Sequence, residues 1–453
     1  VGAGTAELKI NQQTPLHELL PEKGETTWAR VPLTKGLNWV ELSWDTAEEP
    51  KAGFELLWSS PDFEREPVPS SQWFHDPSYL GLQKAQEQRL ARQEFTRLQC
   101  YRCHQLSEEI LTSPQRMAEL DFSAPVLSTV GDEINEEWLY QWILNPHALD
   151  PTSEMPKLFD EDNTADRQTV SDLVAFLKSK VAADPTNAGS TVSGGDEARL
   201  RETGEFLFEE IGCVACHQVY ELDDEDSRIS LHHASTKFNQ KSLQEFLADP
   251  TKNRPAHRMP LFRLEEQEVE ALAAFLMSLE FNLHFPKAAQ GDANAGEKAF
   301  ADFGCANCHA IDGFDAPVRW SLPAAALQSD RGCLSPVAVE ALESGSFSAM
   351  PDFKLGEQRR QSLGQWVTNQ LETLAHDSVE ERSERWVQEL RCHACHQRDG
   401  RGGDLAQILF DESIQGLTPE RLPDLSRAGN KLHVEWLSQF MTAGHSTPLR
   451  PWL

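Results

Sequence analysis

Hydrophobic and polar residues alternate in two different ways along the 453-residue chain. Up to about residue 75, short runs such as Leu37–Trp44 alternate with a period near two and are separated by turn residues such as Lys35 and Gly36. This pattern predicts antiparallel β-strands. Beyond residue 78, apolar residues recur every three or four positions, which predicts helices. The chain is therefore expected to be mainly α-helical, with an antiparallel β-sandwich segment over residues 1–77.

The N-terminal segment differs from the rest of the chain in its predicted secondary structure and its composition. Its predicted strands are Glu7–Ile10, Thr27–Leu33, Leu37–Trp44 and Phe54–Trp58. The segment is rich in tryptophan and contains neither Cys nor Met. We expect the tryptophans to pack inside the sandwich, and a carbohydrate-binding site is the alternative.

Cysteine spacing gives the clearest chemical signal. Eight of the nine cysteines form four Cys-x-x-Cys-His motifs, which we number one to four, at Cys100–His104, Cys213–His217, Cys305–His309 and Cys392–His396. This is the pattern of covalent c-type haem attachment, in which two cysteines three residues apart bond one porphyrin and the next histidine binds its iron. A zinc site would need a second ligand pair close by, and disulfides would leave the histidines without a role. We therefore expect four covalently bound haem c groups.

The individual attachment residues follow directly from these motifs. The expected thioether cysteines are Cys100, Cys103, Cys213, Cys216, Cys305, Cys308, Cys392 and Cys395, and the expected proximal ligands are His104, His217, His309 and His396. Cys333 is left over and is interpreted as a plain buried or loop thiol, with a reactive or intermolecular role as the alternative.

Three Met-Pro pairs follow the first three motifs at similar offsets. Met155, Met259 and Met350 lie 51, 42 and 41 residues after His104, His217 and His309. Each is followed by an amphipathic helical pattern, over Asp166–Val181, Leu264–Leu279 and Gly356–Leu374. Proline favours an extended conformation at the preceding residue, which suits a loop that brings a thioether to iron. We expect these methionines to be distal ligands, with His147, His257 and His445 as competitors.

The order of helix, motif, loop, methionine and helix resembles class I cytochrome c domains. The variants Gly212-Cys-Val-Ala-Cys-His217 and Glu137-Trp-Leu139 are similar to those of planctomycete-type multihaem cytochromes. The resemblance covers residues from about Ser78 to the end. The stretch from Leu57 to Phe63 with Pro67-Val-Pro69 resembles the C-terminal half of a PA14-type β-sandwich, so the N-terminal segment is expected to be incomplete.

Four consecutive modules are predicted on this basis. They span residues 78–184, 196–284, 285–375 and 376–453, with a flexible linker over Asp184–Gly195 and a shorter joint over Phe285–Asp292. In module four, Pro423-Asp-Leu-Ser matches Pro125-Val-Leu-Ser of module one. The chain stops where its distal methionine is expected. We therefore predict a ligand beyond Leu453, with His445 or Met441 as weak candidates and an open iron as a third possibility.

Charge limits the classes of partner. Lys and Arg number 41 against 72 Asp and Glu, which gives a formal net charge of −31. An acidic surface repels phosphate, so nucleic acid is excluded as a partner, and basic docking patches on redox proteins are favoured. No stretch is apolar enough to span a membrane. Haem attachment of this kind occurs outside the cytoplasm, so we expect a periplasmic, cell-surface or extracellular protein whose signal peptide is not in this chain.

Histidine and methionine ligation closes both axial positions of an iron and suits single-electron transfer. The sequence therefore predicts an electron carrier between an extracytoplasmic donor and acceptor, and not an enzyme. One alternative is a peroxidase-like haem oxidoreductase that uses an open fourth haem. Another is a surface assembly protein whose β-sandwich contacts carbohydrate or protein. Arg102, Arg319 and Arg401 are candidates for haem propionate contacts, with surface solvation as the simpler role.

Overall fold

The computed structural model describes residues 5–19, 28–45, 56–68, 72–122, 124–180, 194–219, 228–252, 258–279, 285–315, 322–324, 327, 332–334, 351–411 and 422–442. These residues are mainly α-helical, as the sequence predicts, and also form several small sheets. They divide into two compact parts, Val1–Asp76 and Pro77–Leu453. Within the described residues, no helix is both long and apolar enough to cross a lipid bilayer.

The N-terminal part contains two antiparallel sheets. The first has the strand order β2-β1-β3, formed by β2 (Gln13–Leu19), β1 (Thr5–Ile10) and β3 (Val40–Asp45). The second is a hairpin of β4 (Leu57–Ser60) and β5 (Phe63–Pro67). Asn11 and Gln12 both have positive φ, as a two-residue hairpin turn between β1 and β2 requires.

The sequence-based prediction for this part is confirmed only in places. Antiparallel pairing and the strands at β1, β3 and β4 agree with it, whereas residues 28–33 are irregular and the strands β2 and β5 were missed. The expected tryptophan packing is wrong for Trp28 and Trp39, whose exposed fractions are 73% and 69%. Trp58 does pack on Phe63, with ring centroids 5.1 Å apart.

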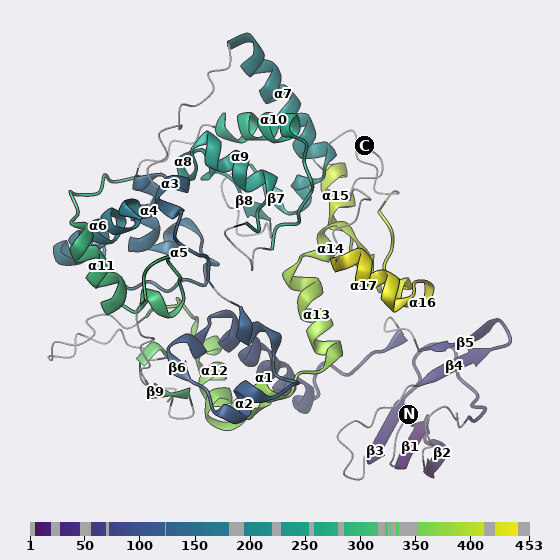
Figure 1. The fold of residues 1–453 in the computed structure, drawn as a ribbon. Coiled ribbons are helices and arrows are strands. Elements are labelled where there is room, and N and C mark those ends of the chain that lie inside the picture. Colours follow the sequence, from purple (N-terminus) through teal and green to yellow (C-terminus); the bar gives the residue numbers. More distant parts are fainter. Residues whose placement is uncertain are drawn as a thin grey trace. The chain divides into compact units, whose positions relative to one another are not determined.

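Three helix pairs organise the C-terminal part (Figure 1). Helix α1 (Leu80–Arg97) packs on α12 (Glu357–Gln370), α6 (Thr164–Ser179) packs on α11 (Ala293–Asp302), and α7 (Gly194–Glu210) packs on α10 (Glu266–Met277). The pairs are nested along the chain: α7 and α10 lie between α6 and α11, and these four helices lie between α1 and α12. We name them the outer unit (residues 80–122 and 322–375), the middle unit (124–180 and 285–315) and the inner unit (194–279).

The three crossings are built from equivalent residues. A phenylalanine five residues before the first cysteine of a motif meets an aromatic residue on the closing helix. The ring pairs and their centroid distances are Phe95–Trp366 at 5.5 Å, Phe300–Phe176 at 5.6 Å and Phe208–Phe275 at 5.7 Å. Because this contact recurs with the same distance, each motif helix has an identified closing helix.

Small residues let the backbones of the crossing helices approach closely. A Cβ atom on Gly204 would lie 2.0 Å from the carbonyl oxygen of Ala271, and one on Gly296 would lie 1.9 Å from that of Asp172. Both glycines stand nine residues before the first cysteine of their motif, and Ala91 holds this position, buried, in the outer unit. Glycine is required where two backbones meet in this way.

The nesting differs from the contiguous modules expected from the sequence. Helix α1 was expected to close on the helix of module one, which is α6, but it closes on α12. Helix α11 was expected to close on α12, but it closes on α6. Residues 78–184 and 285–375 are therefore not packed units, since each contains one half of the outer unit and one half of the middle unit. The helices that follow the three Met-Pro pairs are themselves confirmed, as α6, α10 and α12.

Shorter elements complete these units. The outer unit adds η2 (Cys100–Arg102), β6 (His104–Gln105), α2 (Glu108–Thr112), η3 (Ala118–Asp121), β9 (Leu322–Pro323), η7 (Gly332–Leu334) and η8 (Leu371–Ala375). The middle unit adds α3 (Val130–Glu133), α4 (Glu136–Leu144), α5 (Pro146–Leu149) and η5 (Cys305–Asn307). The inner unit adds η4 (Cys213–Ala215), β7 (His217–Gln218), β8 (Ile229–Ser230), α8 (Ala234–Lys237) and α9 (Gln240–Ala248).

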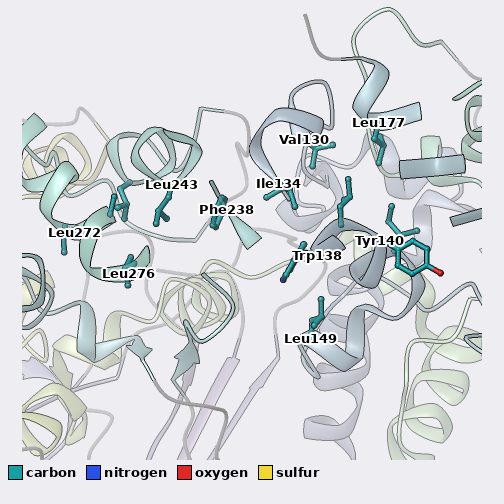
Figure 2. Close-up of a cluster of buried hydrophobic side chains, with 14 of the residues drawn as sticks. Val130, Ile134, Trp138, Tyr140, Leu149, Leu177, Phe238, Leu243, Leu272 and Leu276 are labelled. Atoms are coloured by element: carbon teal, nitrogen blue, oxygen red, sulfur yellow. The ribbon is translucent and has the colours of Figure 1, made fainter. Parts of the chain in front are cut away.

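The middle and inner units share one hydrophobic core, shown in Figure 2. Ile134 and Trp138 of the middle unit lie toward Phe238 of the inner unit, and Ile134 and Phe238 form an isolated antiparallel β-bridge. Asn135 donates from its backbone nitrogen to the carbonyl oxygen of Lys237 over 2.9 Å. The outer unit has a separate core that contains Phe95, Met117 and Trp366. Met117 is fully buried in this core.

The remaining elements form what we name the tail unit (residues 379–442). Its elements are α13 (Val379–Glu389), α14 (Cys392–Cys395), β10 (Gln397–Arg398), β11 (Arg401–Gly402), α15 (Asp404–Asp411), α16 (Ala428–Lys431) and α17 (Val434–Thr442).

A buried ion network fixes the start of the tail unit to the outer unit. Arg385 donates to Glu119 over 2.7 Å and to Asp377 over 2.9 Å, and Arg382 donates to Asp377 over 2.9 Å. The Asp377 side chain has no exposed surface. Burial alone would raise the pKa of Asp377, but the hydrogen bonds from Arg385 and Arg382 outweigh burial, and the pKa is lowered.

Candidate haem-attachment sites

All four Cys-x-x-Cys segments adopt one backbone geometry. The residue before the first cysteine is left-handed in each: Gln99 (φ 52°), Gly212 (φ 85°), Gly304 (φ 74°) and Arg391 (φ 52°). A tight helical turn follows, and it ends the incoming helix so that both cysteines lie on a single turn. Glycine adopts this conformation freely, whereas Gln99 and Arg391 adopt it at a steric cost.

The cysteines are half-buried and free of disulfide bonds. Burial raises the pKa of Cys305 to about 12, and burial together with the nearby Cys103 raises that of Cys308 to about 12. Burial, with a contribution from Cys216, raises the pKa of Cys395 to about 11. A raised pKa keeps Cys305, Cys308 and Cys395 as thiols, the form that is available for thioether bonds.

The motif histidines are oriented by backbone carbonyls. The Nδ1 atom lies 3.3 Å from the carbonyl oxygen of Ile229 in His217, 2.9 Å from that of Pro125 in His309, and 3.0 Å from that of Pro423 in His396. A carbonyl oxygen can only accept, so Nδ1 carries the proton in each ring and Nε2 keeps its lone pair for a metal. This is the tautomer that an iron-binding imidazole needs.

Burial also keeps the best-enclosed imidazoles neutral. It lowers the pKa of His217 to about 4 and lowers that of His309 as well, although the bonded carbonyls act in the opposite direction. A neutral ring is the form that ligates iron. The four turns and the three oriented imidazoles thus fit covalent haem.

Backbone pairing next to each motif histidine shows which other segment of the chain lies beside that motif. His104 pairs with Leu322 in a short parallel ladder, as His217 pairs with Ile229. His309, in contrast, receives its partner from the first half of the middle unit. There, Leu127 donates to the carbonyl oxygen of Ala310 over 2.9 Å, and Asp312 donates to the Ser128 hydroxyl over 2.8 Å.

The tail unit repeats the arrangement around His309 closely. Leu425 donates to the carbonyl oxygen of Gln397 over 2.8 Å, and Asp399 donates to the Ser426 hydroxyl over 2.8 Å. The sequence match between Pro125-Val-Leu-Ser and Pro423-Asp-Leu-Ser therefore has a structural basis. The correction is that Pro125 serves motif three, and not motif one as the order along the chain suggested.

Met155 lies in a half-buried loop of the middle unit. Four residues further on, Phe159 contacts Phe303, two residues before Cys305, with ring centroids 4.9 Å apart. Met259 is half-buried against the core that the inner unit shares with the middle unit. Met350 lies outside the described residues, but Leu355, shortly after it, is buried in the outer core with Leu98.

The segments around the three methionines contact one another. Glu154 forms an ion pair with Arg258 over 3.0 Å, and each of these residues immediately precedes its methionine. Lys157 and Asp352, each two residues after its methionine, exchange two backbone hydrogen bonds of 2.8 and 2.9 Å. The structure thus brings the candidate distal loops of the middle unit, the inner unit and the outer unit together.

The other candidates fall into three groups. His147, in α5, is half-buried, and burial lowers its pKa. His257, His445, Arg319 and residues 184–193 of the predicted linker lie outside the described residues, whereas Gly194 and Gly195 belong to α7. Met441, the other weak candidate for the fourth iron, lies on α17 with an exposed fraction of 65%.

The remaining cationic candidates and Cys333 have simple environments. Arg102 donates to the carbonyl oxygen of Phe122 and stacks over the Tyr101 ring, whereas Arg401 is exposed on β11. Cys333 is half-buried in η7, and burial raises its pKa to about 11. A raised pKa disfavours the thiolate, in agreement with an unreactive thiol. Sequence reasoning missed the carbonyl partners of the histidines, because those partners come from distant segments.

Comparison with protein families gives one match. Residues 202–280 match the family model for cytochrome c. The match over these residues supports a c-type cytochrome. The matched stretch contains motif two and Met259 and corresponds closely to the inner unit, with α7 and α10 as its paired terminal helices. Neither the curated proteins nor the solved structures gave a match to this chain. The match supports a haem-binding electron-transfer protein.

Proposed function

We propose that this cytochrome is a tetrahaem electron carrier. The supporting observation is the recurrence of one attachment geometry: a left-handed residue, a Cys-x-x-Cys turn and an adjacent histidine at four places in the chain. Haem held by cysteines and by axial histidine and methionine supplies reversible one-electron chemistry. The chain's part is to hold each group, to fix the imidazole orientation and to exclude water around it.

The distal ligands are proposed to be shared between chain segments. Met155 is assigned to the haem of Cys305, Cys308 and His309, because its loop packs on the helix of motif three. Met350 is assigned to the haem of His104, and Met259 to that of His217.

The surroundings follow from chemistry and charge. Covalent haem attachment takes place outside the cytoplasm, so the protein is proposed to work in the periplasm, at the cell surface or in the medium. The formal net charge of −31 favours donors and acceptors that present basic docking patches. Electron exchange with such partners should slow as ionic strength rises, because salt screens the attraction between the charged surfaces.

Mass spectrometry of the mature protein tests the proposal. Four haems per chain are expected, and exchange of both cysteines of any one motif for alanine should lower the count to three. A count below four in the unaltered protein would contradict the tetrahaem assignment.

The shared ligand assignment has a separate test. Met155→Ala should remove the near-infrared methionine-to-iron band of one haem. In a chain that lacks motif three, Met155→Ala should change nothing further, whereas in a matched chain that lacks motif one it should still remove a band. If Met155→Ala removed a band only in the chain that lacks motif three, Met155 would instead be the ligand of the haem bound by His104.

A further inference from the structure

Motifs one and three meet directly. The side-chain nitrogen of Asn307, inside motif three, donates to the sulfur of Cys103 over 3.2 Å, and Asn307 is 6% exposed. Cys308, next to Asn307, is close enough to Cys103 for the two thiols to interact electrostatically. The second cysteine of one motif therefore lies beside the second cysteine of the other, although 204 residues separate Asn307 from Cys103.

Motifs two and four form a second contact of the same kind. Helix α15, which packs on the α14 turn of motif four, also packs on the η4 turn of motif two. Val214 and Cys216 belong to one core cluster with Cys395 and Leu405. Arg391, which precedes motif four, lies close enough to Cys216 for its positive charge to act on the pKa of that thiol, in the lowering direction.

These contacts decide which haems are neighbours. Each porphyrin is bonded to its two cysteines, so turns that touch hold their porphyrins at adjacent points. We propose that the four haems form two couples, one on motifs one and three and the other on motifs two and four. This inference rests on the proposed tetrahaem function. Electron exchange falls steeply with distance, so electrons exchange within a couple before they pass between couples, and chain order is not relay order.

Circular dichroism in the Soret region tests the couples in the holoprotein. Two haems held close together give a two-signed, exciton-split band, whereas an isolated haem gives a band of one sign. Motifs are removed in pairs by cysteine-to-alanine exchange, so that two haems remain. Chains that retain motifs one and three, or two and four, are expected to keep the split band. Matched chains that retain one and two, or three and four, are expected to lose it.

If a chain with only two motifs does not fold, the same spectrum is measured on chains from which a single motif has been removed. Removal of motif one and removal of motif three should lower the split-band amplitude equally, and so should removal of two and of four. A relay in chain order predicts instead that removal of two or three costs more than removal of one or four. That result, or a strong split band in the chain that retains only motifs one and two, would refute the proposed pairing of the haems.

Haem counting separates this inference from the proposed function. Mass spectrometry is run on every chain used for dichroism. Fewer than four haems in the unaltered protein would contradict the proposed function itself. Four haems, with a split band that does not follow the expected motif pairs, would overturn the couples alone.

Discussion

Gly296→Ala tests the nested fold at its tightest point. The added methyl carbon would lie 1.9 Å from the carbonyl oxygen of Asp172 and 2.8 Å from Cβ of Phe176. A carbon and a carbonyl oxygen normally stay about 3.3 Å apart or more, so α6 and α11 must separate by roughly 1.4 Å. Overpacking of this kind costs about 1–3 kcal/mol, and the upper end is expected because the obstacle is backbone.

The assay is amide hydrogen exchange of the holoprotein, followed by mass spectrometry. A loss of about 3 kcal/mol corresponds to a rise of about 150-fold in the opening equilibrium, which should appear as faster exchange over α6. Exchange over α12 should stay unchanged, because α12 closes on α1. Faster exchange over α12 with an unaffected α6 would refute the nested arrangement and restore the contiguous modules.

A matched control is available on α16. A Cβ atom on Gly429 would meet no atom within 4 Å, so Gly429→Ala adds the same methyl group without overpacking. Exchange over α6 should be unaltered in this variant. A similar response to both changes would show that the effect of Gly296→Ala is not specific to the crossing.

Two further predictions concern stability. Asp377→Asn should lower the free energy of unfolding by about 3–5 kcal/mol, measured by denaturant titration, since it leaves Arg385 with a buried charge that has lost one partner. Because the folded pKa of Asp377 is lowered, its contribution is complete above about pH 3.8 and is lost as the pH falls further, so the variant should show a weaker loss of stability in acid. Gly304→Ala should cost about 1–2 kcal/mol, because a left-handed backbone must carry a side chain; Gln99→Gly should cost nothing, and a loss in that variant would contradict the strain argument.

The sequence predicts the local parts of this protein well. The helices before the motifs, and those after the Met-Pro pairs, depend on residues close together in the chain. The αL residue before each first cysteine is also visible in advance at Gly212 and Gly304, though not at Gln99 or Arg391. These features could be predicted because short-range chemistry determines them.

The choice of closing helix could not be predicted in the same way. Phe95 and Phe300 stand at the same position relative to their motifs, so either could pack on the aromatic residue of α6 or on that of α12. The one irregularity was the offset of 51 residues from His104 to Met155, compared with 42 and 41 in the other two cases. That longer offset reflects a methionine placed beside a different motif.

The tryptophans show a second limit. A strand pattern and five aromatic residues favoured a packed sandwich, but composition does not determine which face of a strand is covered. Trp28 lies in an irregular stretch and Trp39 just before β3, and both are exposed. The half-buried pair of Trp58 and Phe63 depends on a hairpin that the pattern did not reveal.

Nesting determines the order in which the protein can be assembled. The inner unit is complete once residue 279 has been made, the middle unit needs residue 315, and the outer unit must wait for residue 375. Helix α1 is thus separated from its partner α12 by about 260 residues of chain. Closure of so long a loop is entropically costly and slow. Nesting therefore predicts that the three units close from the inner one outward, and that the haem proposed at the first motif is enclosed last of the three.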